Sequence, residues 1–257
     1  MANDVILKVQ NLDKSFGGLH AVDNVTFEVP QGSIKAVIGP NGAGKTTLFN
    51  MIAGTFTPDS GLVTLKDKVL TGLRPYQVAE LGVFRTFQNL KLSSHMSVLD
   101  NVLLGRHTAG TAGFISGMLS LKKSRIEESD AREKVLEILE WLNITEIMNK
   151  EVGNLSFGKQ RSVELARLLA ADPVVLLLDE PAAGLNMHET DEMASLIVKI
   201  RDQGRTVLLV EHDMSLVMDI SDEIVVLNFG QKIADGTAAS VQNNREVIKI
   251  YLGGEDD

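Results

Sequence analysis

The alternation of apolar and polar residues predicts short strands separated by turns along the first part of the chain. Residues 5–9 are β-like, and residues 25–29 alternate between apolar and polar side chains as half-buried strands do. A strand is predicted at residues 33–38, which end in a glycine-rich loop, and a helix is predicted from about Lys45. A further short strand is predicted at residues 63–65, where a charged turn follows.

The middle of the chain has helical periodicity instead. One face of a predicted helix over residues 124–142 gathers the apolar side chains of Ala131, Val135, Ile138, Leu139 and Leu142. A second helix is predicted at residues 157–171. Residues 108–120 are rich in glycine, serine and threonine, which predicts a loop or a mobile hairpin.

The last third of the chain returns to alternating strands and helices. Residues 174–178 are continuously apolar, as is typical of a parallel strand that is buried on both faces. A helical apolar stripe follows at Met193, Leu196, Ile197 and Ile200. Strands are predicted at residues 206–210 and 223–227. This order predicts an α/β core interrupted by a helical insertion at about residues 89–170.

Composition and charge then exclude several classes of protein. The chain has 257 residues, no cysteine, and a formal net charge of −9 from 25 basic and 34 acidic residues. The absence of cysteine excludes disulfides, thiolate metal sites and a cysteine nucleophile. The acidic balance, without a block of basic residues, argues against binding nucleic acid through bulk electrostatics.

No segment is predicted to cross a membrane. The longest stretch without Asp, Glu, Lys or Arg, residues 107–121, is shorter than the roughly 20 apolar residues of a spanning helix and contains several glycines. Residues 1–4 lack the basic start of a secretory signal. The chain is therefore expected to be made and kept in the cytoplasm.

Residues 39–46, GPNGAGKT, match the phosphate-binding pattern G-x-x-x-x-G-K-[ST]. The glycines let the backbone curl until amide groups converge on phosphate oxygens, and the following helix directs its dipole at the same anion. Lys45 would bridge the β- and γ-phosphates of ATP, and the Thr46 hydroxyl would bind Mg²⁺. The alternative is a plain glycine-rich turn, but the strand before and the helix after favour the phosphate site.

Two carboxylates follow the predicted strand at residues 174–178. Asp179 stands at its carboxyl end, where ligands of parallel sheets gather, and would hold the magnesium ion. Glu180 is not needed for the metal and suits a general base that orients the attacking water. The alternative for Glu180 is a solvated acid at the start of a helix.

Further segments resemble those of ABC-type ATPases, and they occur in the same order. Residues 155–160, LSFGKQ, resemble the LSGGQ signature of that family, and residues 183–186, AGLN, resemble its D-loop. Gln88 looks like the Q-loop glutamine, His212 like the switch histidine, and Phe16 like the aromatic residue that stacks on adenine.

The resemblance covers essentially the whole chain, with departures at three positions. Phe157 replaces the first glycine of the signature, and Lys159 replaces a common glutamine. Asn186 stands where many relatives carry aspartate. An aromatic residue at position 157 is tolerable if it faces away from the phosphate.

The resemblance implies an α/β fold: a P-loop NTPase core of the RecA-like type with an N-terminal antiparallel β-subdomain and an inserted α-helical subdomain. It implies one ABC ATPase domain over residues 1–257. Residues 1–88 and 171–238 would form the nucleotide-binding core, residues 89–170 the helical signature subdomain, and residues 239–257 a C-terminal extension.

The resemblance also implies that two ATP molecules are sandwiched between two head-to-tail ATPase subunits, with Ser156 and Gly158 of one subunit reaching the γ-phosphate held by the other. Asn186 would communicate across that interface. The implied catalytic residues are Glu180, His212 and Gln88, and the implied magnesium ligands are Thr46, Gln88 and Asp179. The implied nucleotide-binding residues are Phe16, Gly39, Asn41, Gly42, Ala43, Gly44, Lys45, Thr46, Thr47, Ser156, Gly158 and Gln160.

Within the family, residues 39–50, 82–89, 181–186 and 250–254 look like the ATP-binding subunits of branched-chain (hydrophobic) amino-acid importers. This implies two membrane permeases, a second ATPase subunit that is a non-identical paralogue or, in isolation, another copy, and an external substrate-binding protein. The chain would be peripheral, at the cytoplasmic face of the inner membrane, with no nucleic-acid partner.

Apolar residues would form a groove for a permease helix within residues 88–104, namely Leu90, Leu92, Met96, Val98 and Leu99, although a folded core would use them equally well. Alternatives to amino-acid import are the ATPase of a urea or amide importer or of a lipopolysaccharide exporter. A soluble ABC ATPase acting on DNA or ribosomes and a nucleotide-binding module without turnover are the remaining alternatives.

Overall fold

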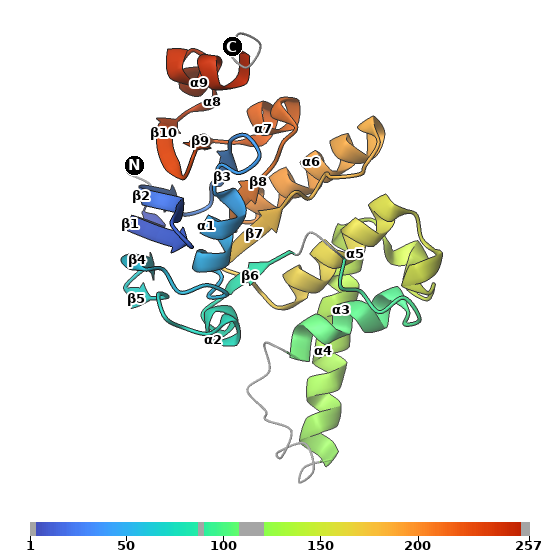
Figure 1. Cartoon of the computed structure of the whole chain (residues 1–257). Helices are drawn as coiled ribbons and strands as arrows, with labels where there is room; N and C mark the ends of the chain where they lie inside the picture. The colour runs from blue at the N-terminus through green and yellow to red at the C-terminus, as the bar shows by residue number, and fades with distance from the viewer. Residues whose placement is uncertain (1–3, 87–89, 108–120, 253–257) are drawn as a thin grey trace. The chain divides into compact units, whose positions relative to one another are not determined.

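The structure is a computed structural model that describes residues 4–86, 90–107 and 121–252. The chain divides into two compact units (Figure 1). The first contains residues 1–85, 174–183 and 190–257, and the second contains residues 86–173 and 184–189.

An antiparallel sheet of the order β2-β1-β4-β5 forms one layer of the first unit. Its strands are β1 (Val5–Phe16), β2 (Leu19–Pro30), β4 (Ser60–Leu65) and β5 (Lys68–Val69). The hairpin between β1 and β2 turns through Gly17 and Gly18, which both have positive φ angles, and pairs Phe16 with Leu19.

A second sheet of the first unit has the order β10-β9-β3-β8-β7-β6. Its strands are β3 (Ile34–Ile38), β6 (Val83–Arg85), β7 (Val175–Asp179), β8 (Thr206–Val210), β9 (Glu223–Asn228) and β10 (Gln231–Gly236). All neighbours are parallel except β9 and β10. Every residue of β3, β7 and β8 is buried, as expected for strands covered on both faces.

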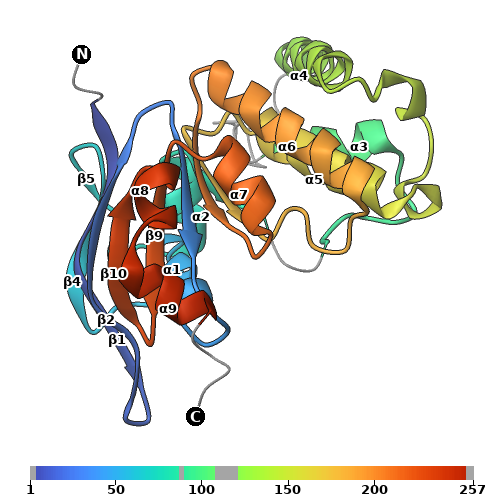
Figure 2. The same ribbon diagram turned by 90° about the horizontal axis from the view of Figure 1, so that it is seen from above.

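Helices cover both faces of this second sheet. They are α1 (Lys45–Ile52), α2 (Pro75–Glu80), α6 (Met187–Asp202), α7 (Met214–Ile220), α8 (Ala238–Gln242) and α9 (Arg245–Leu252). Val37 of β3 packs into the core that contains α1 and the antiparallel sheet. Its neighbours Ala36 and Ile38 pack with α7, α8 and α9 on the opposite face, and Figure 2 shows α8 and α9 beside β9 and β10.

The second unit is helical. It contains α3 (Val98–His107), α4 (Leu121–Trp141) and α5 (Phe157–Ala170), which contact one another. The side chain of Asn101, which is fully buried, donates to the carbonyl oxygens of Ser93, Met96 and Ser97 and accepts from the amide of Ser93. It therefore fixes the loop that leads into α3.

The expected fold class is confirmed. The antiparallel sheet and the mostly parallel sheet are both present, and the helices α3, α4 and α5 are inserted between β6 and β7. The strand predicted at residues 206–210 has those bounds. Val98 and Leu99 are buried in the core, so they do not offer surface for the expected permease groove. The loop or hairpin predicted at residues 108–120 lies outside the described residues, and the predicted domain boundaries stay predictions.

Candidate functional site

The glycine-rich loop lies between β3 and α1, as predicted. Gly39 and Gly44 have φ angles of 151° and 98°, which side chains rarely tolerate. A Cβ atom at Gly39 would collide with the carbonyl oxygen of Leu227, and one at Gly44 with that of Ala21. Glycine is therefore required at both positions for the loop to pack against its neighbours.

Lys45 is buried within the loop that it follows. Its Nζ donates to the carbonyl oxygens of Gly39, at 2.6 Å, and Pro40, at 3.0 Å. Burial lowers the pKa of the Lys45 ammonium, and the negative charges of Glu180 and Asp179 oppose that shift. A cation held among backbone groups at a helix start is suited to binding the phosphates of a nucleotide.

The loop is also fixed by a segment distant in sequence. The amide of Gly230, in the turn between β9 and β10, donates to the carbonyl oxygen of Ala43 at 3.1 Å. Tyr251 of α9 reaches Gly39, whose backbone hydrogen bond to the phenol opposes the rise in the pKa of Tyr251 caused by burial. Both contacts join the C-terminal part of the chain to the glycine-rich loop.

Asp179 ends β7 and is nearly fully buried. Its Oδ2 accepts from Arg85 Nη2 at 2.7 Å, and Arg85 Nη1 also donates to Asn50 Oδ1 of α1 at 2.6 Å. The Arg85 guanidinium also lies over the ring of Phe49, 5.8 Å from its centroid. Sequence reasoning missed Arg85, because the basic residue and its carboxylate are 94 positions apart.

Glu180 and His212 form a close pair. His212 Nε2 lies 2.7 Å from Glu180 Oε1, with the side chains 45% and 19% exposed. Glu180 has a φ angle of 50°, and its amide donates to the carbonyl oxygen of Val210 at 2.9 Å. Glu180 directly follows β7, and His212 stands two residues after β8. These two strands are parallel neighbours in which Asp179 pairs with Val210. A carboxylate and an imidazole in this arrangement can hold and transfer a proton.

The buried carboxyl of Glu211 lies beside this pair, and it too was missed by sequence reasoning. Burial raises its pKa, backbone hydrogen bonds oppose the shift, and the charge of Glu180 adds to it. The signal was present in the sequence, because Glu211 stands between an apolar strand and His212.

Phe16 ends β1 and is 44% exposed rather than part of the core. Its ring meets that of Phe56 edge to face, with centroids 5.6 Å apart, and Lys14 Nζ lies 5.5 Å from its centroid. An exposed aromatic face of this kind can stack on a base.

The signature residues lie at the start of α5, in the second unit. Ser156 is the N-cap of that helix, and its hydroxyl oxygen accepts from the amide of Lys159. A Cβ atom at Gly158 would lie 2.6 Å from Glu189 Oε1, at the end of a flexible side chain, so a larger residue here would require Glu189 to shift. Glu189 and Asn186 cap each other, because each backbone amide donates to the other's side chain.

Phe157 is held within its own unit. The guanidinium of Arg161 lies 5.2 Å from its ring centroid, and its ring edge lies next to Gly184. Gln160 Nε2 donates to the carbonyl oxygen of Leu155 at 3.1 Å. The position of Phe157 beside Gly184 places the aromatic side chain at the D-loop.

The first unit thus brings together Lys45, Asp179, Glu180 and His212 at the carboxyl ends of β3, β7 and β8, three neighbouring strands. The remaining loop residues Asn41, Gly42, Thr46 and Thr47 lie with Lys45 between β3 and the first turn of α1, and the Thr46 side chain is exposed. The second unit holds Ser156, Gly158 and Gln160. Gln88 lies outside the described residues.

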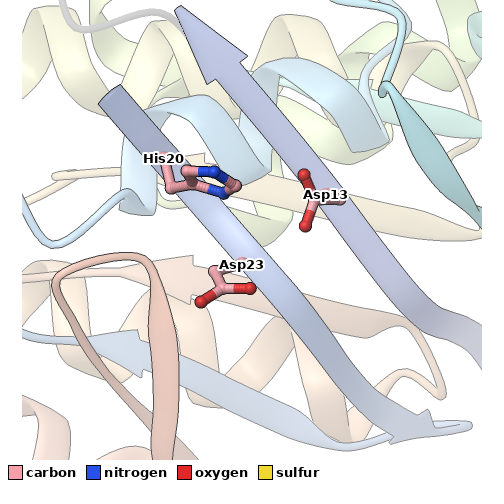
Figure 3. A group of neighbouring side chains, drawn as sticks. All are labelled: Asp13, His20 and Asp23. Atoms are coloured by element: carbon pink, nitrogen blue, oxygen red, sulfur yellow. The ribbon is translucent and has the colours of Figure 1, made fainter. Parts of the chain in front are cut away.

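A separate group of polar side chains lies on the antiparallel sheet (Figure 3). Asp13 of β1 and His20 and Asp23 of β2 point toward one another, with one possible ligand atom of each within 4.8 Å of the others. Asp23 Oδ2 also accepts from Gln231 Nε2 of β10 at 2.6 Å. Exposed acidic groups are common without a metal ion, and we assign none to this group.

Comparison with known proteins gives consistent matches along the chain. Residues 22–183 match the family described as ABC transporter, and residues 231–257 match that described as branched-chain amino acid ATP-binding cassette transporter. The chain is 45% identical, over 96% of its length and 98% of the relative, to the high-affinity branched-chain amino acid transport ATP-binding protein BraF of Pseudomonas aeruginosa. It is 44% identical, over the same shares, to LivG of Escherichia coli, whose description is the same.

Solved structures of ATP-binding cassettes also match nearly the whole chain. A nucleotide-free ATP-binding cassette from an ABC transporter superposes with a TM-score of 0.85 and 31% identity, covering 97% of this chain and 100% of the other. An ADP conformation of an ATP-binding cassette gives a TM-score of 0.85 and 32% identity, covering 97% and 99%.

Proposed function

Because the chain belongs to the ABC transporter family of ATPases, we propose that it energises the import of branched-chain, hydrophobic amino acids through partner permeases. The observation that carries the proposal is the near-full-length similarity to ATP-binding proteins of branched-chain amino acid transport, which includes a separate match at residues 231–257. The proximity of Glu180 to His212 supports turnover rather than nucleotide binding alone.

In the proposed reaction, Glu180 accepts a proton from the water that attacks the γ-phosphate of ATP. His212 donates to the γ-phosphate, and its contact with Glu180 places both groups on the same side of the site. Lys45 binds the β- and γ-phosphates, and Phe16 offers its exposed ring to the adenine. Catalysis then consists of positioning and charge stabilisation.

Magnesium fits the donor set, and we propose it as the metal that accompanies ATP. The buried carboxylate of Asp179 and the exposed hydroxyl of Thr46 are both hard oxygen donors, as Mg²⁺ prefers. When bound, the ion neutralises the charge of the phosphates. The ion pair between Arg85 Nη2 and Asp179 Oδ2 orients the Asp179 carboxylate. Gln88 is proposed as a further ligand from its place in the sequence.

We propose that Ser156 and Gly158 act on the nucleotide of a second ATPase subunit. Ser156 is exposed at the start of α5, where its hydroxyl and the first helical amides can bind an anion. Gln160 supports this turn through its hydrogen bond to Leu155. The second subunit is a non-identical paralogue in the working complex, and another copy of this chain can take its place in isolation.

None of the described helices is long and apolar enough to cross a membrane. We propose that two permease subunits hold the chain at the cytoplasmic face of the inner membrane, with an external binding protein delivering the amino acid. Leu90, Leu92 and Met96, which are partly exposed, are the groove residues that remain available for a permease helix.

The proposal is tested by co-expressing the chain with the proposed partner permeases and reconstituting the complex into vesicles with the binding protein. We expect ATP-dependent uptake of labelled leucine, isoleucine or valine, and no uptake when Lys45 is replaced by alanine. Uptake of urea or amides instead, or export of lipopolysaccharide, would identify another branch of the family. Turnover that no permease affects would support a soluble ABC ATPase instead.

A further inference from the structure

Glu211 directly follows β8 and is only 4% exposed. Its two carboxylate oxygens bind two different segments of the chain. Oε1 accepts from the amide of Ala182 at 2.8 Å, and Oε2 accepts from the amide of His212 at 2.9 Å. One side chain therefore joins the segment that follows β7 to the segment that follows β8.

These hydrogen bonds close a ring around Glu180 and His212. Ala182 stands two positions after Glu180, and His212 stands directly after Glu211. The side chains of Glu180 and His212 meet at 2.7 Å, which completes the ring. The amide of Glu180 also donates to the carbonyl oxygen of Val210. The segment after β7 is therefore joined to the end of β8 both at Glu180 and at Ala182.

The chemistry of the ring explains why a carboxylate stands at this position. Two backbone amides approach from different segments, and each needs an acceptor. A carboxylate offers two acceptor oxygens on one rigid group, whereas a glutamine amide offers one and a hydroxyl offers one. Burying a carboxylate near another carboxylate is unfavourable, and the raised pKa of Glu211 reflects that penalty. A buried group with this cost is typical of a functional site rather than of a purely stabilising contact.

We propose that Glu211 is a positioning residue for ATP hydrolysis, which sets the spacing between Glu180 and His212 by binding the backbone of both segments. The proposal rests on the proposed ATPase function. In the proposed role, Glu211 does not contact the nucleotide. It acts through the two residues that do, so its loss lowers turnover and leaves nucleotide binding intact.

The full-length protein with Glu211→Gln tests the proposal. Glutamine keeps the size of the side chain but can accept from only one of the two amides. We expect kcat for ATP to fall by about 10–100-fold, because small displacements of catalytic groups have effects of this order. We expect the KM for ATP and the affinity for a fluorescent ATP analogue to change by less than about twofold.

Thr206→Val provides the matched control. Thr206 lies at the opposite end of β8, is fully buried, and its hydroxyl oxygen accepts from the amide of Gly32 at 3.0 Å. The control therefore also removes one buried acceptor of a backbone amide, but at a distance from the pair. It should lower the melting temperature without lowering kcat. An equal loss of kcat in both variants would overturn the proposal.

A double-mutant cycle with His212→Ala separates positioning from general packing. If Glu211 acts through His212, its replacement should have almost no further effect on kcat once His212 is removed. Independent, additive effects would contradict the proposal. If Glu211→Gln does not fold, Glu211→Asp, which keeps both oxygens at shorter reach, enters the same cycle. A wild-type protein without ATP turnover would contradict the proposed function itself rather than the role of Glu211.

Discussion

At the scale of single residues, Glu180 is held by its backbone as well as by its side chain. Its φ angle of 50° is uncommon for a residue with a Cβ atom and costs about 1 kcal/mol or more. The hydrogen bond from its amide to Val210 maintains this conformation. In this conformation the carboxylate of Glu180 contacts His212 Nε2 at 2.7 Å, so the strain accompanies the orientation of the proposed base.

Glu180→Gln should keep the affinity for ATP and Mg²⁺ but lose turnover by about 10²–10⁴-fold, because an amide cannot accept the proton of the attacking water. Steady-state phosphate release and equilibrium binding of an ATP analogue measure the two quantities. Glu28→Gln is the control, because Glu28 lies in an exposed pair with Lys8. Unchanged phosphate release in the Glu180 variant would remove this residue from the role of general base.

Arg85→Met should lower the free energy of unfolding by about 3 kcal/mol. The variant keeps an apolar stem against Phe49 but removes the cation that accompanies the buried carboxylate of Asp179, whose pair is 11% and 4% exposed. Denaturant titration measures the loss. In the exposed pair of Lys8 with Glu28, Lys8→Met should cost less than about 1 kcal/mol. Equal costs in the two variants would show that Arg85 does not stabilise Asp179.

At the scale of elements, the sequence predicted those strands whose local hydrophobic pattern matches their burial in the folded protein. The run at residues 206–210 became β8 without change, since every residue in it is buried. β1 extends to Phe16, beyond the predicted residues 5–9, because its pairing with β2 continues through polar positions such as Lys14 and Ser15. That extension comes from the partner strand rather than from hydrophobic alternation.

Short elements and distant contacts could not be predicted in this way. β6 has three residues, and β10 carries few apolar ones, so neither has a distinct pattern of its own. The glycine-rich loop and Asp179 were singled out by their motifs, and their roles toward ATP and Mg²⁺ stay predictions. Arg85, which binds Asp179, was not recognisable, because its role depends on which strands become neighbours in the sheet. Glu211 could be noticed beside His212, but its hydrogen bond with the amide of Ala182 could not be predicted, for the same reason.

The link that Glu211 makes between the ends of β7 and β8 should give stability a characteristic pH dependence. Its pKa in the folded protein is raised above the ordinary value of 4.5 by burial and by the charge of Glu180, while backbone hydrogen bonds from Ala182, His212 and Asp213 oppose the shift. The folded state therefore binds the proton more tightly, and its stabilising effect is present below pH 4.5 and is lost as the pH rises through the raised pKa.

Glu211→Gln should lack this loss of stability. Denaturant titrations of both proteins from pH 4 to 8 should show the wild type losing free energy of unfolding relative to the variant as the pH increases. A difference between the two proteins that stays constant over this range would show that Glu211 does not titrate differently in the folded and unfolded states.

At the scale of the whole molecule, the formal charge of −9 bears on how the chain reaches a membrane. Anionic lipid surfaces attract basic segments and repel acidic proteins. Attachment should therefore depend on permease subunits. In flotation assays the isolated protein should stay with the soluble fraction in the presence of anionic vesicles, and it should float with vesicles that contain the permeases. Binding to protein-free anionic vesicles would argue for a lipid contact.

The proposed assembly of two ATPase subunits gives the most demanding test at this scale. With Glu180→Gln to block turnover, ATP and Mg²⁺ should shift the protein from monomer to dimer in light scattering. Adding Ser156→Arg should prevent the shift, because Ser156 is exposed and arginine adds bulk and charge where the second nucleotide is expected.

The substitution at Ser156 also removes the N-cap of α5, which by itself costs about 1 kcal/mol. Thr237→Arg is the matched control, because Thr237 is the exposed N-cap of α8 and its hydroxyl oxygen accepts from the amide of Ser240. Both variants lose a cap and gain a positive charge, but only the Ser156 variant should stay monomeric with ATP. If both variants dimerise, the signature residues do not face a second nucleotide-bound subunit. If neither does, loss of a helix cap accounts for the effect, and the head-to-tail arrangement loses this support.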